Sequence, residues 1–504
     1  MKRFLCVVLA VFMILAAGCS SGSNDSGGGE TGYRDTLVFC QGNDLTTLDG
    51  SIGLQERAVS LTNHIFDPLF VVNLDYEVVG SLAESYEWQD DVSLAVKLRE
   101  GVKFHDGSDM TAEDVKYTMD LIDERGSIFV GNYAGCEIVD DYNIIIRTND
   151  PNPALPNVLS MPQTCILPSD AYDPDSFAVN PIGTGPYKMK EFKEGDYYTL
   201  ERFDDYWGQP AKTQYLTLRI VPEPSQRTIL LETGEVDVAY NIPINDIKRI
   251  EGDPNLKILT CPSMKVILMD LNCESDGPVG NAKVRRAIEC AIDKESIISS
   301  LLEGYGEAVD GIVSPHAKDY RETTANAYDP QLAESLMKEA GFADGFEISL
   351  FTNSDQINGE IAQVLQSQLS KVGITLKITI QDDNTTFSMV ENGQDYDMIL
   401  DFFQTSSAHA NDVFNNMLYS TSFNNYSRYY SDEFDQTYVQ YASTAEGPER
   451  EALLDKLYEL IQRDTPGIGL YLENKIVAAT SGVDGIIMSC IGAHEFQEAT
   501  VKAE

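Results

Sequence analysis

The feature that most restricts the fold is a recurring order of helix, glycine and alternating strand. Residues 358–371 carry apolar side chains at helical spacing, Gly373 follows them, and apolar and polar residues alternate over 374–380. An amphipathic helix that ends at a glycine and leads into a half-buried strand is the repeating unit of a layered α/β lobe. Residues 93–99 show the same alternation of a half-buried strand. The sequence therefore predicts an α/β fold.

Further helices are predicted from apolar periodicity and from end signals. Thr111 followed by Asp114 is typical of a helix start that has an acid at its N3 position. An apolar stripe over residues 282–302 predicts one long helix that ends at Gly304. Residues 330–340 predict another helix.

The start of the chain has the pattern of a secretory signal. A basic beginning precedes an apolar run over residues 5–17, which is too short to span a bilayer. Cys19 directly follows a small-residue cleavage site, an arrangement that resembles the bacterial lipobox, in which this thiol is lipidated. We expect a signal peptide over residues 1–18 and a lipidated Cys19 with a flexible linker over 19–35. The alternative is an ordinary secreted protein with an unmodified Cys19.

The charge balance restricts the partners of the chain. It has 80 acidic and 36 basic residues, for a net charge of −44. Nucleic-acid binding requires Lys and Arg to neutralise phosphates, so we expect no nucleic-acid partner. Seven cysteines follow Cys19, and this odd number leaves at least one thiol unpaired. None of them forms a C-x-x-C pair, so we expect no structural zinc site.

A series of short motifs runs through most of the chain. The motifs, in order, are LAES (82–85), LREGVKFHDG (98–107), TAEDV (111–115), TGPY (184–187), RFDDYWG (202–208), TGEVDV (233–238), VRRAI (284–288), AGF (340–342) and DTP (464–466). Their order and spacing resemble the bacterial extracellular solute-binding proteins of family 5, the peptide and nickel receptors of ABC importers. The resemblance extends from Thr36 to about Gly482.

This resemblance implies a type II periplasmic-binding-protein clamshell with two binding lobes and a smaller extra domain. Lobe I is expected over residues 36–68, 184–263 and 473–504. Domain II is expected over residues 69–183, and lobe III over residues 264–472. The two lobes would close over a ligand by hinge rotation. The implied protein is an extracytoplasmic, lipid-anchored, monomeric receptor that is not an enzyme and has no cofactor. It would deliver a small peptide or related solute to ABC permease and ATPase subunits.

The resemblance also indicates where the ligand binds. Lobe I would contribute the loop after Gly50, and lobe III would contribute a strand over residues 396–401 and the loop that follows it. The candidate ligand-binding residues are Leu54, Gln55, Glu56, Asp401, Phe402, Phe403, Gln404, Ser406, Asn411 and Asp412.

At this site the chain departs from the peptide-binding pattern. Such relatives usually have Gly-Trp at positions 402–403 and, a few residues later, an Asp that pairs with the α-ammonium of the peptide. Here that Asp is missing around Ser406, and a buried ammonium without a carboxylate would cost several kcal/mol. Asp401, Asp412 or Glu56 can substitute. Alternatively, the ligand is a capped or cyclic peptide, or a small polar compound stacked on a Phe side chain.

Two features of this stretch have simpler interpretations. Neighbouring residues on a strand face opposite ways, so we expect one of Phe402 and Phe403 to pack in the core. His409 suggests nickel, but no set of partnering ligands accompanies it, so we expect no metal site.

Two other functions remain open from sequence. A secreted hydrolase would be expected to carry a G-x-S-x-G elbow, an H-E-x-x-H helix or a P-loop, and none of these is found. A sensor with the same clamshell fold and no transport partner would have the same sequence features as a receptor.

Overall fold

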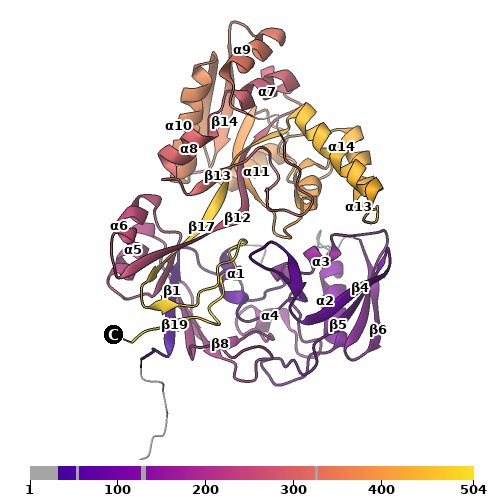
Figure 1. Cartoon of the computed structure of the whole chain (residues 1–504), viewed down its shortest axis with the longest axis vertical. Coiled ribbons are helices and arrows are strands. Elements are labelled where there is room, and N and C mark those ends of the chain that lie inside the picture. The colour runs from indigo at the N-terminus through magenta and orange to yellow at the C-terminus, as the bar shows by residue number, and fades with distance from the viewer. Residues whose placement is uncertain (1–31, 53–55, 126–131, 324–326, 504) are drawn as a thin grey trace, which may run out of the picture.

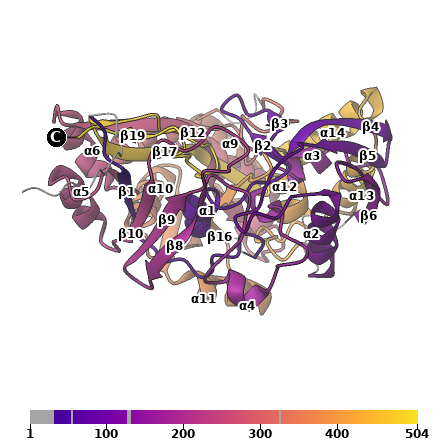
Figure 2. The same cartoon turned by 90° about the horizontal axis from the view of Figure 1, so that it is seen from below.

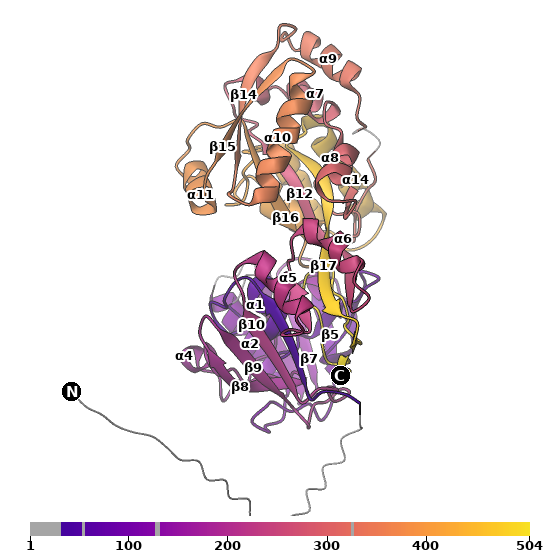
Figure 3. The ribbon, with the colours of Figure 1, turned by 90° about the vertical axis from the view of Figure 1, so that its left-hand side faces the viewer.

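The computed structural model describes residues 32–52, 56–125, 132–323 and 327–503, and the side chains of residues 56–58 are not described. The molecule has an upper and a lower half, joined by two long strands, β12 (Leu256–Leu271) and β17 (Gly467–Thr480) (Figures 1 and 3). The predicted signal peptide, Cys19 and most of the linker lie outside the described residues.

One large mixed sheet extends through both halves. Its strand order is β15-β14-β16-β12-β17-β11-β1-β10-β9-β8, and β13 also pairs with β17. The remaining strands of this sheet are β15 (Ile374–Ile380), β14 (Phe346–Thr352), β16 (Met398–Gln404), β11 (Val238–Tyr240), β1 (Thr36–Gln41), β10 (Tyr215–Ile220), β9 (Tyr197–Arg202), β8 (Tyr187–Lys193) and β13 (Gly306–Ala308). Strands β14 to β16 belong to the upper half, and β1 and β8 to β11 belong to the lower half (Figure 3).

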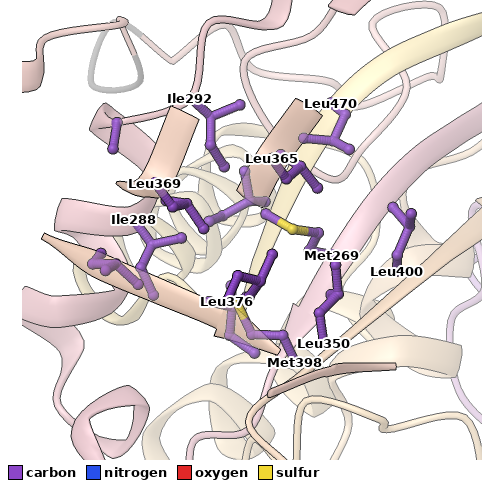
Figure 4. Packing of buried hydrophobic residues seen from close by; sticks show 14 of the residues in the cluster. Met269, Ile288, Ile292, Leu350, Leu365, Leu369, Leu376, Met398, Leu400 and Leu470 are labelled. Atoms are coloured by element: carbon purple, nitrogen blue, oxygen red, sulfur yellow. The ribbon is translucent and has the colours of Figure 1, made fainter. Parts of the chain in front are cut away.

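Helices surround the upper part of the sheet (Figure 1). They are α7 (Ala282–Cys290), α8 (Lys294–Leu301), α9 (Pro330–Glu339), α10 (Gln356–Ser370), α11 (Asp383–Glu391), α12 (Asn411–Val413), the π-helix η5 (Phe414–Leu418), α13 (Asp432–Ala442) and α14 (Pro448–Asp464), with the short 3₁₀ turn η4 (Pro278–Gly280). Figure 4 shows Met269, Ile288, Leu365, Leu400 and Leu470 converging from strands and helices into one buried apolar cluster. This burial supplies the main stabilisation of the upper half.

The lower half contains a separate small sheet beside the large one (Figure 2). Its order is β4-β5-β7-β6, formed by β4 (Ala83–Asp90), β5 (Ser93–Leu98), β7 (Asn143–Thr148) and β6 (Tyr133–Asp140). The other elements of this half are α1 (Glu56–Thr62), β2 (Phe70–Val72), β3 (Val78–Gly80), α2 (Ala112–Glu124), α3 (Leu155–Val158), η2 (Pro162–Thr164), α4 (Pro174–Phe177), α5 (Pro224–Glu232), η3 (Ile244–Asp246), α6 (Ile247–Glu251), β18 (Val483–Asp484) and β19 (Thr500–Val501).

Most predicted elements are confirmed. Strand β5 buries Leu94, Val96 and Leu98 on one face. Helix α10 is followed by Gly373, whose φ of 84° lies in the left-handed region, and then by β15. Helix α2 begins after Thr111, whose backbone N–H donates to the Asp114 carboxylate at 2.8 Å.

The single helix predicted over residues 282–302 is wrong, because two helices, α7 and α8, occupy this stretch. Asp293 caps α8 by accepting a hydrogen bond from the Ser296 N–H at 3.0 Å. The Gln368 side chain on α10 accepts from the Asp293 N–H at 2.9 Å and donates to the Asp293 carbonyl at 3.0 Å. This side chain satisfies backbone groups that a continuous helix would have paired, so the break is stable.

The predicted lobe boundaries at 263/264 and 472/473 fall inside β12 and β17, and the division into three domains remains a prediction. Several non-covalent contacts between described residues link the small-sheet region to the upper half, among them a hydrogen bond and a ring stack. The Asn157 side chain donates to the Ser407 carbonyl at 2.8 Å. The Tyr76 ring stacks on His316 with centroids 4.2 Å apart.

Across the described ranges, the structure contains no helix whose length and apolar character would suit a membrane span.

A buried arginine fixes the strand ends of the lower half. Arg227 on α5 is 3% exposed and donates to the carbonyls of Val221 (2.7 Å), Pro222 (3.1 Å), Tyr240 (2.9 Å) and Asn241 (2.5 Å). These carbonyls lie at the carboxyl ends of β10 and β11. In the upper half, Arg285 of the VRRAI motif bonds to main-chain carbonyls in the same way.

We expect Arg227→Met to lower the free energy of unfolding by about 2–4 kcal/mol, because several buried carbonyls lose their donor. Urea unfolding followed by circular dichroism measures this loss. The control is Arg219→Met, since Arg219 is more exposed and its salt bridge among the described residues is a long one, to Glu235 at 3.9 Å. This variant should lower the free energy of unfolding by less than about 0.5 kcal/mol. If both variants lower the free energy of unfolding equally, the hydrogen bonds of Arg227 to the carbonyls do not stabilise the fold.

Candidate functional site

The sheet topology makes the strand ends of the two halves face each other. Strand β16 is antiparallel to β12, and β14 and β15 are parallel to β16, so their carboxyl ends point toward the lower half. Strand β11 is antiparallel to β17, and β1 and β10 run with it, so their carboxyl ends point toward the upper half. Ligands of open α/β sheets bind outside the carboxyl ends of the strands. The candidate site therefore lies between these two sets of ends.

A charged pair and an aromatic ring lie where the long strands cross this region. The Lys265 ammonium on β12 is 3.1 Å from a Glu473 carboxylate oxygen on β17 and 4.2 Å from the centroid of the Phe402 ring. Burial acts to raise the pKa of Glu473, but Lys265 and Lys475 outweigh it and hold that pKa below its ordinary value. The ion pair and the cation–π contact fix the lysine beneath the aromatic ring.

The two phenylalanines of β16 have different surroundings. Phe402 is 44% exposed. Phe403 is half-buried and packs against the apolar cluster that includes Phe414 and Leu472. The expectation that one of the pair packs in the core is met by Phe403, and Phe402 is the ring that a ligand can reach.

Asp401 lies between Leu400 and Phe402 and forms no salt bridge with any described residue. Burial raises its pKa from 3.8 to about 6, with Asp383 adding to the rise and the Phe402 N–H and Lys265 opposing it. Asp270, on the adjacent strand β12, is 3% exposed, and burial together with Asp401 raises its pKa well above the ordinary value. Two neighbouring carboxylates therefore lack a cation of their own.

Asp412 has a structural contact in place of the cationic partner considered from sequence. Its carboxylate accepts from the Ser407 N–H at 3.0 Å and from the Ser407 hydroxyl at 2.7 Å. Burial raises its pKa to about 6, and the two bonds from Ser407 oppose that rise. In this structure Asp412 therefore fixes the loop after β16.

The remaining upper-half candidates lie on the same loop or near it. The Gln404 side chain donates to the Ile491 carbonyl at 3.4 Å and so ties β16 to the C-terminal segment. The Asn411 N–H donates to His409 Nδ1 at 3.1 Å, and Ser406 is half-buried.

The lower-half candidates cannot be placed in the same way. Leu54 and Gln55 lie outside the described residues, and Glu56 is described only as the first backbone position of α1. Their role in ligand binding remains a prediction.

His409 is part of a buried polar cluster. Its Nε2 lies 3.6 Å from a carboxylate oxygen of Asp319, which also accepts from Arg450 at 2.5 Å and from Tyr441 at 2.6 Å. Burial lowers the pKa of His409 to about 3, so the ring is neutral. Among the residues that the structure describes, no three His, Cys, Asp or Glu side chains are grouped to hold a metal ion.

Sequence reasoning missed Lys265, Asp270 and Glu473. Lys265 and Asp270 interrupt the otherwise apolar run SMKVILMDL, and Glu473 interrupts the run GIGLYLENKIV. A charged residue inside a buried strand is rarely tolerated without a partner or a function. The charged residues that interrupt these two apolar runs were the sequence signal that could have identified the three positions.

Two lobes that share a sheet, with facing strand ends and an exposed aromatic ring at one of them, are typical of a protein that binds a small solute. The chain belongs to the bacterial extracellular solute-binding proteins, family 5, whose middle-region profile matches residues 77–425. The family, the α/β type II clamshell and the function of solute binding for an ABC importer, all predicted from sequence, are thereby confirmed. Members of this family are extracytoplasmic and work with ABC permease and ATPase subunits.

Relatives match over nearly the whole chain. The glutathione-binding protein GsiB of Shigella dysenteriae is 27% identical over 519 residues, which cover 98% of each chain. Among solved structures, the ABC transporter substrate-binding protein CtaP of Listeria monocytogenes superposes with a TM-score of 0.85 at 23% identity, over 93% of this chain and 99% of that one. The oligopeptide-binding protein AppA of Bacillus subtilis, in complex with a nonapeptide, has a TM-score of 0.75 at 25% identity, over 94% and 99%.

The raised pKa of Asp401 predicts how pH changes stability. Because the folded-state pKa is about 6 against an ordinary 3.8, the stability that the neutral carboxyl contributes is complete below pH 4 and is lost as the pH rises through 6. Asp401→Asn cannot ionise. As the pH rises from 4 to 7.5, the free energy of unfolding of the variant should therefore increase by roughly 1–3 kcal/mol relative to that of wild type.

Urea unfolding at both pH values measures this difference. Asp395→Asn, at an exposed position of the same half, is the control and should show no such gain. If the free energies of unfolding of Asp401→Asn and wild type differ by the same amount at both pH values, the raised pKa of Asp401 is contradicted.

Proposed function

We propose that the chain is a lipid-anchored, monomeric receptor that captures a small peptide or a related solute and delivers it to the permease. We also propose that it catalyses no reaction and that lobes I and III close over the solute by hinge rotation about β12 and β17. The observation that supports this proposal most strongly is the exposed Phe402 ring, fixed over Lys265 at the facing strand ends.

The relatives support the class of solute. GsiB is named for binding glutathione, which is itself a peptide, and the AppA structure contains a nonapeptide. A solute with amide groups and at least one ionised end would use the polar strand ends and the side chains around Phe402.

The proposal is tested by identifying what the protein carries. Native mass spectrometry of the soluble body, purified without refolding, should show an added mass that matches a small peptide. Titration calorimetry with synthetic di- to tetrapeptides should then give saturable binding. If no peptide adds mass or heat while a non-peptide solute does, the peptide assignment is wrong.

Phe402 should contribute directly to affinity. Replacing it by alanine removes the exposed ring, so we expect peptide affinity to fall by about 3- to 10-fold, as for the loss of one aromatic contact. Phe192→Ala is the control, because Phe192 is a 39% exposed aromatic residue on the edge strand β8. Equal affinities of Phe402→Ala and wild type would place the solute away from β16.

The anchor is tested separately. Cys19→Ala should move the protein from the membrane fraction to the soluble extracytoplasmic fraction, because the lipid-bearing thiol is lost. Fractionation and immunoblotting measure the distribution, with Cys261→Ala as a control that leaves the lipobox intact. A Cys19→Ala variant that stays in the membrane fraction would contradict anchoring through this residue.

A further inference from the structure

Two acidic residues share one face of the sheet in the upper half. Asp401 on β16 pairs in register with Leu268 on β12, and Asp270 lies two residues beyond Leu268 on the same face. Residues related in this diagonal way across antiparallel strands are close neighbours. The charge of Asp401 contributes to the raised pKa of Asp270, which is the electrostatic consequence of this proximity.

Asp270 has no partner within the described part of the chain. It is 3% exposed, and none of the described residues forms a hydrogen bond or a salt bridge with its carboxylate. The other buried acids of the upper half are paired differently: Asp319 pairs with Arg450, and Glu289 pairs with Arg286 at 3.0 Å. A buried ionised carboxylate without a cation or a donor is unfavourable by several kcal/mol, so this position is exceptional.

The surroundings do not supply the missing positive charge. Asp383, at the start of α11, adds negative charge. Tyr426 is a further titratable group near Asp401 and Asp270, and Tyr396 and Cys273 are further ones near Asp270. Lys265 is the nearby cation, and its ammonium already pairs with Glu473. The site is therefore negative unless protons or a foreign cation neutralise it.

The chemistry of the group favours an organic cation over a metal ion. Within the described residues, no third His, Cys, Asp or Glu joins the pair in an arrangement that could hold a metal. Asp401 is the more accessible of the two acids and lies nearer to the carboxyl end of β16, so a ligand group that enters from the facing strand ends reaches Asp401 first. An ammonium or a guanidinium suits a pair of carboxylates, because it donates charge-assisted hydrogen bonds to both.

We propose that Asp401 and Asp270 form a subsite that binds a cationic group of the solute, either its α-ammonium or a lysine-like or arginine-like side chain. This inference rests on the proposed function, because it specifies the solute class of the same site. It assigns Asp270, at the inner end of the subsite, as a residue that determines specificity for positive charge.

The proposal implies that binding depends on pH. Below pH 6 Asp401 is mostly protonated and cannot pair with a cation, so affinity for a cationic solute should rise between pH 5 and 8, with release of a proton on binding. Lys265, Asp383, Asp270 and Tyr426 are the charged and titratable groups that face Asp401. A neutral solute should show no such dependence.

The experiment is titration calorimetry with five probes at pH 5.5 and 7.5. Ala-Ala-Ala carries only an α-ammonium, acetyl-Ala-Lys-Ala carries only a side-chain ammonium, Ala-Lys-Ala carries both, and acetyl-Ala-Ala-Ala carries neither. Agmatine is a cation without any peptide bond. The proteins are wild type, Asp270→Asn, Asp401→Asn and the control Asp395→Asn.

We expect at least one cationic probe to bind wild type tenfold or more tightly than its acetylated or lysine-free counterpart at pH 7.5. This preference should be lost in Asp270→Asn and Asp401→Asn and kept in Asp395→Asn. The two acetylated probes distinguish an α-ammonium from a side-chain ammonium. Thermal unfolding of each variant checks that it is folded, which we expect because Asn removes an unfavourable buried charge.

Three results would overturn the subsite: equal binding of cationic and neutral probes, unchanged preference in both Asn variants, or no binding of any cationic probe. Peptide binding without charge preference would leave the proposed function standing and remove the subsite. Binding of agmatine without binding of any peptide would keep the subsite and remove the peptide assignment.

Discussion

The backbone ladder between β12 and β17 is the interaction on which the rest of the structure depends. These strands pair from Leu256 with Thr480 to Asp270 with Gly467, so one pair of strands serves as an inner element of both halves. The register shifts between Pro262 and Val266, where the chain passes from one half to the other. Such irregularities bend and twist a ladder locally. The relative orientation of the halves is therefore determined by a few residues of two strands, and the facing strand ends follow from it.

The charged side chains placed on this ladder show two different electrostatic solutions. Glu473 is half-buried and its pKa is held below the ordinary value, because two lysines lie close to it. Asp270 is more deeply buried, and the charged group that acts on its pKa is another acid, Asp401. The lysines of the protein balance the charge of Glu473, whereas no cation of the described residues pairs with Asp270. Since both lie within one sheet, the sheet is at once the framework of the fold and a wall of the candidate site.

The sequence predicted the elements whose signals are local. The helix before Gly373 and the strand over 93–98 follow from periodicity that needs no distant partner. The helix over 282–302 was predicted wrongly, because its interruption at Asp293 depends on Gln368, a residue 75 positions away. The same limit applies to the site. Phe402 and Asp401 became candidates through a family motif. Lys265, Asp270 and Glu473 become candidates only once β12, β16 and β17 are seen to lie side by side. The bonds of Asp412 to Ser407 are local, yet no periodic pattern distinguishes a loop-fixing carboxylate from a ligand-binding one.

The contacts of Tyr76 with His316 and of Asn157 with Ser407 have a consequence for kinetics. They join the small-sheet region to the upper half without a covalent link, so any rotation that separates the halves must break them or carry both partners along. The activation barrier for opening then contains contributions from residues outside the candidate ligand-binding set. Residence time in the site could accordingly be altered independently of equilibrium affinity, which would set how fast cargo is handed over.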